Sequence, residues 1–262
     1  MIQEINGLNI HYQEEGEGIP LLLLHGWGCN LGHMDTLKNH FKASYRVIAI
    51  DIPGFGESDE PPSVWGTKDT ADCIAAFLQK VEVQKPVMVG HSNGGRIAID
   101  LAARGLCRRL ILLDSAGIKP KRSLEYYFKV YSYKTMKKCL DLPGLNHKKE
   151  EILEKRREKA GSADYQAASP RMRQILSKVV NEDLRPLLAK ITVPTLLVWG
   201  GKDTATPVED GREMEAILKK SGADAALIVF DGAGHYAFLE ENVRFLRVME
   251  AFLQPLKENR NA

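Results

Sequence analysis

The stretch K-P-V-M-V-G-H-S-N-G-G, residues 85–95, decides the fold of this chain. The apolar residues 87–89 predict a short buried parallel strand, and residues 96–104 carry apolar side chains at helical spacing. Between them, residues 90–94 match G-x-S-x-G, a tight strand-to-helix turn that projects the hydroxyl of Ser92 away from the sheet. Glycines beside the serine leave room for a strained backbone. The stretch predicts a nucleophilic serine, and the alternative is a glycine-rich turn with an incidental serine.

Composition bounds the partners that the chain can have. Of its 262 residues, 44% are hydrophobic and 27% charged, as in ordinary soluble globular proteins. The net charge of +2 gives no argument for nucleic acid. We therefore expect no nucleic-acid partner. The further expectations are a small-molecule substrate, no membrane partner, and a monomer or homodimer.

Cysteine spacing and the N-terminal residues predict the compartment. Cys29, Cys73, Cys107 and Cys139 are widely spaced and form no C-x-x-C, which fits reduced thiols rather than disulfides or a zinc site. The first residues lack a basic n-region, and no apolar run approaches the length of a membrane span. We expect a cytoplasmic protein without metal or cofactor.

Strand and helix patterns alternate along most of the chain. Alternating residues 2–15 around Asn6 and Gly7 predict a β-hairpin. Further strands are expected at residues 21–24, 45–50, 110–113, 195–199 and 226–230, and helices at 34–41, 67–81, 209–220 and 243–256. This order predicts an α/β fold with a mostly parallel, doubly wound sheet. Reacting groups of such sheets collect at the carboxyl ends of strands, where His25, Asp51, Ser92 and Asp114 all lie.

Residues 117–190 break this alternation and predict a helical insertion into a core made of residues 1–116 and 191–262. Helices are expected at residues 124–140, 147–160 and 169–180. Residues 119–190 hold 18 Lys and Arg against 9 Asp and Glu, so the insertion is basic while the remainder of the chain is acidic. Its basic runs are expected to be a solvated helix surface.

A serine nucleophile needs a base in contact and an acid that orients the base. Of seven histidines, His235 ends a glycine-containing loop directly after a predicted strand, whereas His25 is expected to be structural and His91 to point away from Ser92. Asp203 lies in the turn W-G-G-K-D at another strand end, and the order Ser, Asp, His is the one expected on such a sheet. Asp114 is the weaker candidate for the acid. Either aspartate could instead be a capping carboxylate.

The motifs H-G-W-G (25–28), D-x-P-G-F-G-x-S (51–58), G-H-S-N-G-G (90–95), G-G-K-D (200–203) and G-A-G-H (232–235) together resemble the landmarks of the α/β-hydrolase superfamily. The resemblance covers essentially the whole chain apart from the insertion. The insertion resembles the helical cap that this superfamily carries between strands six and seven. The resemblance implies an α/β-hydrolase fold with an inserted cap.

The resemblance also implies roles for single residues. Ser92 is the expected nucleophile, His235 the general base and Asp203 the acid, with the backbone N–H groups of Trp27 and Asn93 forming the oxyanion hole. The indole of Trp27 is expected to wall the acyl pocket. A serine nucleophile argues against haloalkane dehalogenases and epoxide hydrolases, which use aspartate. The loop H-G-W-G lacks the S-G-x-G run associated with carbon–carbon bond hydrolases, so that activity is disfavoured.

Aromatic residues in the insertion suggest substrate contacts. Residues 126–133, Y-Y-F-K-V-Y-S-Y, hold five of the nineteen aromatic side chains. Tyr127 and Tyr131 share a helical face, and with Tyr236 they are candidate substrate-binding residues. The alternative is that these aromatics pack the core of a small cap.

The sequence thus predicts a cytoplasmic, cofactor-independent serine hydrolase. Its substrate would be a small acyl ester or a similar activated carbonyl, cleaved through a Ser-His-Asp triad and an acyl-enzyme intermediate. Alternatives on the same scaffold are an aminopeptidase, a lactonase and a carbon–carbon bond hydrolase. A different class of alternative is a small-molecule receptor or signalling protein that turns over slowly.

Overall fold

A computed structural model describes residues 1–120 and 168–258 of the chain. The chain divides into two compact units, one of residues 1–118 with 182–262 and the other of residues 119–181. The helices predicted at 124–140 and 147–160, with Tyr127 and Tyr131, lie outside the described residues. The helical cap over residues 117–190 stays a prediction.

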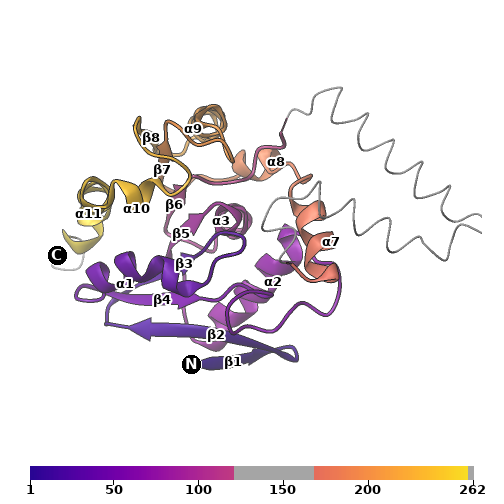
Figure 1. The fold of residues 1–262 in the computed structure, drawn as a ribbon. Helices are drawn as coiled ribbons and strands as arrows, with labels where there is room; N and C mark the ends of the chain where they lie inside the picture. Colours follow the sequence, from indigo (N-terminus) through magenta and orange to yellow (C-terminus); the bar gives the residue numbers. More distant parts are fainter. Residues whose placement is uncertain (121–167, 259–262) are drawn as a thin grey trace, which may run out of the picture. The chain divides into compact units, whose positions relative to one another are not determined.

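The larger unit contains an eight-stranded sheet with the strand order β1-β2-β4-β3-β5-β6-β7-β8 (Figure 1). The strands are β1 (Ile2–Ile5), β2 (Leu8–Glu15), β3 (Ile19–Leu24), β4 (Tyr45–Ile50), β5 (Val87–His91), β6 (Arg109–Leu113), β7 (Thr195–Gly200) and β8 (Ala225–Phe230). β2 pairs antiparallel with both β1 and β4, and the remaining pairs are parallel. The predicted α/β fold with a mostly parallel sheet is confirmed.

The first two strands form the predicted hairpin. Asn6 and Gly7 have φ angles of 51° and 82°, as a two-residue turn between twisted antiparallel strands requires. Ile5 pairs with Leu8 beside the turn, so the register follows directly from the turn.

Helices cover both faces of the sheet. The helices of this unit are the 3-10 helix η1 (Leu31–Met34), α1 (Asp35–Phe41), α2 (Thr67–Lys80), α3 (Asn93–Ala103), α8 (Arg185–Leu188), α9 (Val208–Lys220), α10 (Ala237–Glu240) and α11 (Asn242–Glu258). One buried cluster joins the sheet to α2, α3 and α9, and a second joins it to α1, α10 and α11.

Each central strand contributes to both clusters because successive side chains point to opposite faces. In β3, Leu22 and Leu24 pack with Phe77 of α2, whereas Leu21 and Leu23 belong to the cluster that contains Leu37 of α1. This double coverage explains the continuous apolar runs that predicted the strands.

Helix α3 begins at Asn93, three residues earlier than the predicted residue 96. Asn-Gly-Gly is typical of a turn, but here it forms the first turn of the helix. A Cβ atom at Gly94 would overlap the carbonyl oxygen of Leu24 in β3, so close packing of helix on strand accounts for the glycine. Helices η1, α8 and α10 were not predicted, since each is too short to show a helical period.

The described part of the smaller unit contains α7 (Pro170–Val179), which confirms the helix predicted there. Ser169 caps it by accepting a hydrogen bond from the N–H of Met172 at 3.1 Å, and Pro170 suits the first helical position. Within residues 1–120 and 168–258, no helix has the length and apolar content needed to cross a bilayer.

The strand order changes direction at β3. From β3 the chain passes to β4 on one side and then to β5 on the other, so the loops after β3 and β5 leave neighbouring strands at the same edge. Such a switch point is where open α/β sheets bind ligands. Trp27 follows β3 and Ser92 follows β5, so this edge holds the candidate site.

Candidate active site

Ser92 occupies the turn between β5 and α3 in a conformation that is rare for a residue with a Cβ. Its φ and ψ angles are 50° and −112°, a strain of about 1–3 kcal/mol that the surroundings must offset. Its N–H donates to the Leu113 carbonyl at 3.0 Å, and its own carbonyl accepts from Gly95 and Ala116 at 3.1 and 3.0 Å. These bonds to the neighbouring strand and helix hold a half-buried serine in the strained turn.

His235 lies between Ser92 and Asp203. Its Nε2 is 3.0 Å from the Ser92 Oγ, and its Nδ1 is 2.8 Å from the Asp203 Oδ2. The structure therefore brings together the three side chains that the sequence placed at separate strand ends.

The carboxylate of Asp203 is held by its own loop. Its Oδ1 accepts from the N–H groups of Ala205 and Thr206 at 2.8 and 3.1 Å, and its Oδ2 accepts from the Thr206 hydroxyl at 2.7 Å. Burial opposes ionisation of Asp203, but hydrogen bonds from His235 and Thr206 outweigh it and hold its pKa below the usual value. An ionised carboxylate only accepts, so the proton of His235 sits on Nδ1 and the Nε2 lone pair faces Ser92.

His91 hydrogen-bonds the backbone of the loop that carries His235. Its Nε2 lies 2.8 Å from the His235 carbonyl oxygen, which can only accept, so His91 carries its proton on Nε2. Burial lowers the pKa of His91 to about 3, so the ring is neutral. As predicted, His91 does not hydrogen-bond Ser92. Its support of the His235 backbone was not foreseen, because nothing in the sequence pairs these two residues.

The loop after β3 packs against the serine. A Cβ built on Gly26 would lie 3.3 Å from the Ser92 Cβ and 2.8 Å from the His91 Nδ1. In the described residues, neither the Trp27 N–H nor the Asn93 N–H donates to another protein group. Asn93 follows Ser92 in the sequence, and Trp27 follows Gly26, the residue that packs on Ser92. Both N–H groups thus remain candidate donors for a ligand.

His25 ties the β3 loop to the loop after β4. It is fully buried, its Nδ1 lies 2.7 Å from the Gly26 carbonyl oxygen, and its Nε2 accepts the N–H of Ile52 at 3.0 Å. Burial lowers the pKa of His25 to about 4, so the ring is neutral, as one donating and one accepting nitrogen require. This geometry agrees with the structural role expected of His25.

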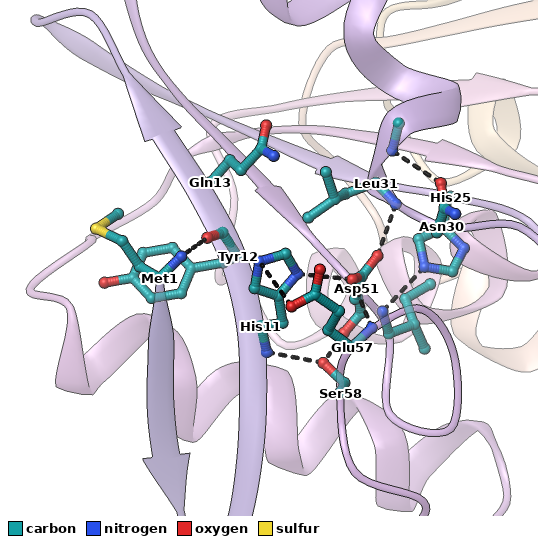
Figure 2. Close-up of polar contacts among 12 residues, drawn as sticks. Met1, His11, Tyr12, Gln13, His25, Asn30, Leu31, Asp51, Glu57 and Ser58 are labelled. Carbon is teal, nitrogen blue, oxygen red and sulfur yellow. Dashed lines mark hydrogen bonds and ion pairs between the residues drawn. The ribbon is translucent and has the colours of Figure 1, made fainter.

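Asp51 gathers three further segments around one buried carboxylate (Figure 2). Its Oδ1 accepts from the N–H of Leu31 at 2.7 Å, and its Oδ2 accepts from the N–H of Glu57 at 3.0 Å. The same Oδ2 lies 2.8 Å from the Nδ1 of His11 in β2. Asp51 therefore joins the hairpin, the segment after β3 and the loop after β4 at the carboxyl end of β4.

Asp114, the weaker candidate for the acid, faces backbone groups instead of the imidazole. Its Oδ1 accepts from the N–H of Gly200 at 2.7 Å, and its Oδ2 accepts from the N–H of Ala237 at 3.0 Å. Burial raises the pKa of Asp114 to about 7. The geometry places Asp203, and not Asp114, in contact with His235.

The remaining described candidates, Tyr236 and Trp27, contact other side chains of the protein. The Tyr236 hydroxyl lies 3.5 Å from the Cys29 Sγ, and its ring centroid lies 4.9 Å from that of His91, so a substrate contact for Tyr236 stays a prediction. The ring of Trp27 packs edge-on against Phe55 at 4.8 Å. In the part of the chain that the structure describes, no group of three or more His, Cys, Asp or Glu could hold a metal ion.

Comparison with known proteins agrees with this architecture. The family model described as alpha/beta hydrolase fold matches residues 19–242. The chain belongs to the α/β-hydrolase family. It is an α/β-fold hydrolase, the enzyme class that its motifs predicted.

Individual relatives are distant but match along their length. The chain is 27% identical to the AB hydrolase superfamily protein YisY of Bacillus subtilis, over 94% of this chain and 95% of the relative. It is 28% identical to a pimeloyl-[acyl-carrier protein] methyl ester esterase of Aliivibrio salmonicida, over 95% and 98%. Among solved structures, a membrane phospholipase A superposes with a TM-score of 0.76 at 28% identity, over 100% of this chain and 86% of that chain.

Proposed function

We propose that this α/β hydrolase is a serine esterase that cleaves a small acyl ester through a covalent acyl-enzyme. The observation that carries the proposal is the relay from Ser92 Oγ to His235 Nε2 at 3.0 Å and from His235 Nδ1 to Asp203 Oδ2 at 2.8 Å. Nucleophile, base and orienting acid at hydrogen-bond distance are what nucleophilic catalysis by serine requires.

In the first half of the reaction, Ser92 Oγ attacks the ester carbonyl carbon while its proton passes to His235 Nε2. The imidazolium that forms is stabilised by the Asp203 carboxylate, which stays ionised because its pKa is low. Collapse of the tetrahedral intermediate breaks the bond to the leaving alkoxide, which takes the proton from His235 Nε2. An acyl group is left on Ser92.

In the second half, a water molecule takes the place of the alcohol. His235 accepts its proton as the oxygen attacks the acyl carbon, then returns the proton to Ser92 Oγ when the carboxylic acid leaves. The same tautomer of His235 acts in both halves of the reaction, so its one hydrogen bond to Asp203 lowers both barriers.

The N–H groups of Trp27 and Asn93 are proposed to bind the oxyanion of each tetrahedral intermediate. Their freedom from other described partners and the packing of the β3 loop on Ser92 support this assignment. Backbone donors fixed before the reaction need no reorganisation as the charge forms, and one such donor typically lowers the barrier by about 3–4 kcal/mol.

An ester is favoured over the alternatives by the relatives. A methyl ester esterase is among the relatives that match nearly end to end. A helical cap over residues 117–190 and a cytoplasmic location complete the proposal.

The test is a panel of p-nitrophenyl esters of graded acyl length, with a lactone, an aminoacyl amide and a vinylogous diketone beside them. The expected result is a burst of p-nitrophenol of about one equivalent per active site, followed by steady turnover, with short acyl esters hydrolysed fastest. Faster turnover of the lactone, the amide or the diketone would replace the ester assignment. A burst without turnover would favour a receptor.

A further inference from the structure

We propose that Asp114 is a positioning residue that holds the acid loop and the histidine loop in register with Ser92. The acid loop is defined here as residues 200–206 and the histidine loop as residues 231–237. The proposal rests on the esterase function proposed above, and it gives a role to a buried carboxylate that the mechanism does not use.

The two carboxylate oxygens of Asp114 divide between the two loops. Oδ1 accepts from the N–H of Gly200, which opens the acid loop three residues before Asp203. Oδ2 accepts from the N–H of Ala237, two residues after His235. One side chain therefore sets the separation of the backbones that carry the acid and the base.

The main chain of Asp114 adds a third link to the acid loop. Its carbonyl oxygen lies 3.0 Å from the Thr206 hydroxyl, which in turn lies 2.7 Å from Asp203 Oδ2. Its N–H donates to the Val198 carbonyl in β7 at 2.9 Å. The residue thus contacts the acid loop through a backbone amide and through the hydroxyl that touches Asp203.

The residues on either side of Asp114 bind the serine turn. The Leu113 carbonyl accepts the Ser92 N–H, and the Ala116 N–H donates to the Ser92 carbonyl, both at 3.0 Å. The segment 113–116 is therefore bonded to all three parts of the relay. Asp114 itself has a φ of 42°, a region that aspartate tolerates better than most residues and that aims its side chain between the loops.

The surroundings of Asp114 suit a positioning residue rather than a catalytic group. Asp114 is fully buried, and within residues 1–120 and 168–258 no Lys, Arg or imidazole nitrogen hydrogen-bonds its carboxylate. Burial raises the pKa of Asp114, because the buried site destabilises the ionised carboxylate. An amide at this position would turn an N–H₂ donor toward one backbone N–H, so one of the two loops would lose its bond.

The experiment compares Asp114→Asn with Asp100→Asn. Asp100 is also a buried aspartate, on α3, but its partner is Arg104. Turnover is normalised to sites titrated with a fluorophosphonate, and the proton on His235 Nδ1 is followed as a low-field 1H NMR resonance. Asp114→Asn should lower kcat about 10- to 100-fold with a smaller change in KM, as a misplacement of about 1 Å does, and should shift or broaden the resonance. Asp100→Asn should leave both near wild type.

Wild-type kcat and an unmoved resonance in Asp114→Asn would overturn the proposal, as would an equal loss in Asp100→Asn. If the amide variant does not fold, Asp114→Ser takes its place, because the shorter serine hydroxyl can accept from at most one of the N–H groups of Gly200 and Ala237. Asp114→Ser should lower kcat and move the resonance, and wild-type behaviour there would also overturn the proposal. If the wild-type protein hydrolyses no ester, the proposed function fails separately, because the resonance still reports whether Asp114 positions His235.

Discussion

Two buried aspartates end the neighbouring strands β6 and β7 and differ in what their carboxylates face. Asp203 meets an imidazole nitrogen and a hydroxyl, and its pKa lies below the usual value. Asp114 meets two backbone amides, and burial raises its pKa to about 7. Position at a strand end is common to both. The role of each carboxylate follows from the groups that the adjoining loops bring to it.

The largest expected effect separates the two aspartates directly. Asp203→Asn keeps the shape of the acid but favours the wrong tautomer of His235, so kcat on a p-nitrophenyl ester should fall about ten-thousand-fold. The fall should far exceed that of Asp114→Asn, which leaves the hydrogen bond between Asp203 and His235 possible. Circular dichroism of each variant serves as the control for folding. A greater loss in Asp114→Asn would exchange the roles that we assign.

The pH dependence of stability should have opposite signs at the two positions. Because the pKa of Asp203 is lowered on folding, its contribution to the free energy of unfolding is present above its unfolded pKa and is lost as pH falls through its folded pKa. Because the pKa of Asp114 is raised to about 7, the folded state binds the extra proton, and stability falls as pH rises from about 4 to 7.

Urea unfolding of the wild type and both asparagine variants between pH 3 and pH 8 measures these slopes. Relative to wild type, Asp114→Asn should gain stability as pH rises from about 4 to 7. Asp203→Asn should be less stable than wild type at neutral pH, and this difference in the free energy of unfolding should shrink as pH falls. Parallel curves for all three proteins would mean that neither carboxylate changes its proton affinity on folding.

A smaller effect is expected at Asp51, the third buried aspartate of this edge. Unlike Asp114, it has an imidazole partner, since His11 Nδ1 lies 2.8 Å from its Oδ2 (Figure 2). His11→Asn should lower the free energy of unfolding by about 1–3 kcal/mol, because the buried carboxylate loses one of its three hydrogen-bond donors. The matched control is His40→Asn, which breaks an exposed pair with Glu250 and should cost at most about 1 kcal/mol. Equal losses in urea unfolding would show that burial of the His11 pair adds nothing.

The sequence predicted the fold and the three relay residues because their signals are local. The turn around Ser92 is a contiguous motif, and the apolar runs before Ser92, Asp203 and His235 place each at a strand end. Parallel strands bring such ends to one edge, so the approach of the three side chains follows from the fold.

The sequence ranked Asp203 above Asp114 as the acid, but it did not predict the contacts that Asp114 makes instead. Asp114 accepts a hydrogen bond from Ala237, 123 residues further along the chain, and no spacing in the sequence specifies that contact. Thr206 lies three residues after Asp203, in a segment that matches no motif, and nothing in the sequence predicts the contact of its hydroxyl with the Asp114 carbonyl oxygen. The early start of α3 was missed because close packing, and not a turn, requires Gly94.

The most direct test of the central claim is covalent labelling of Ser92. An alkyl fluorophosphonate should add to one site, the peptide that contains Ser92, as read by mass spectrometry. Ser92→Ala should stay folded, fail to label and lose nearly all ester hydrolysis. Ser115→Ala, at a buried serine of the neighbouring turn, should still label at Ser92. Labelling at another serine, or full activity in Ser92→Ala, would contradict the account.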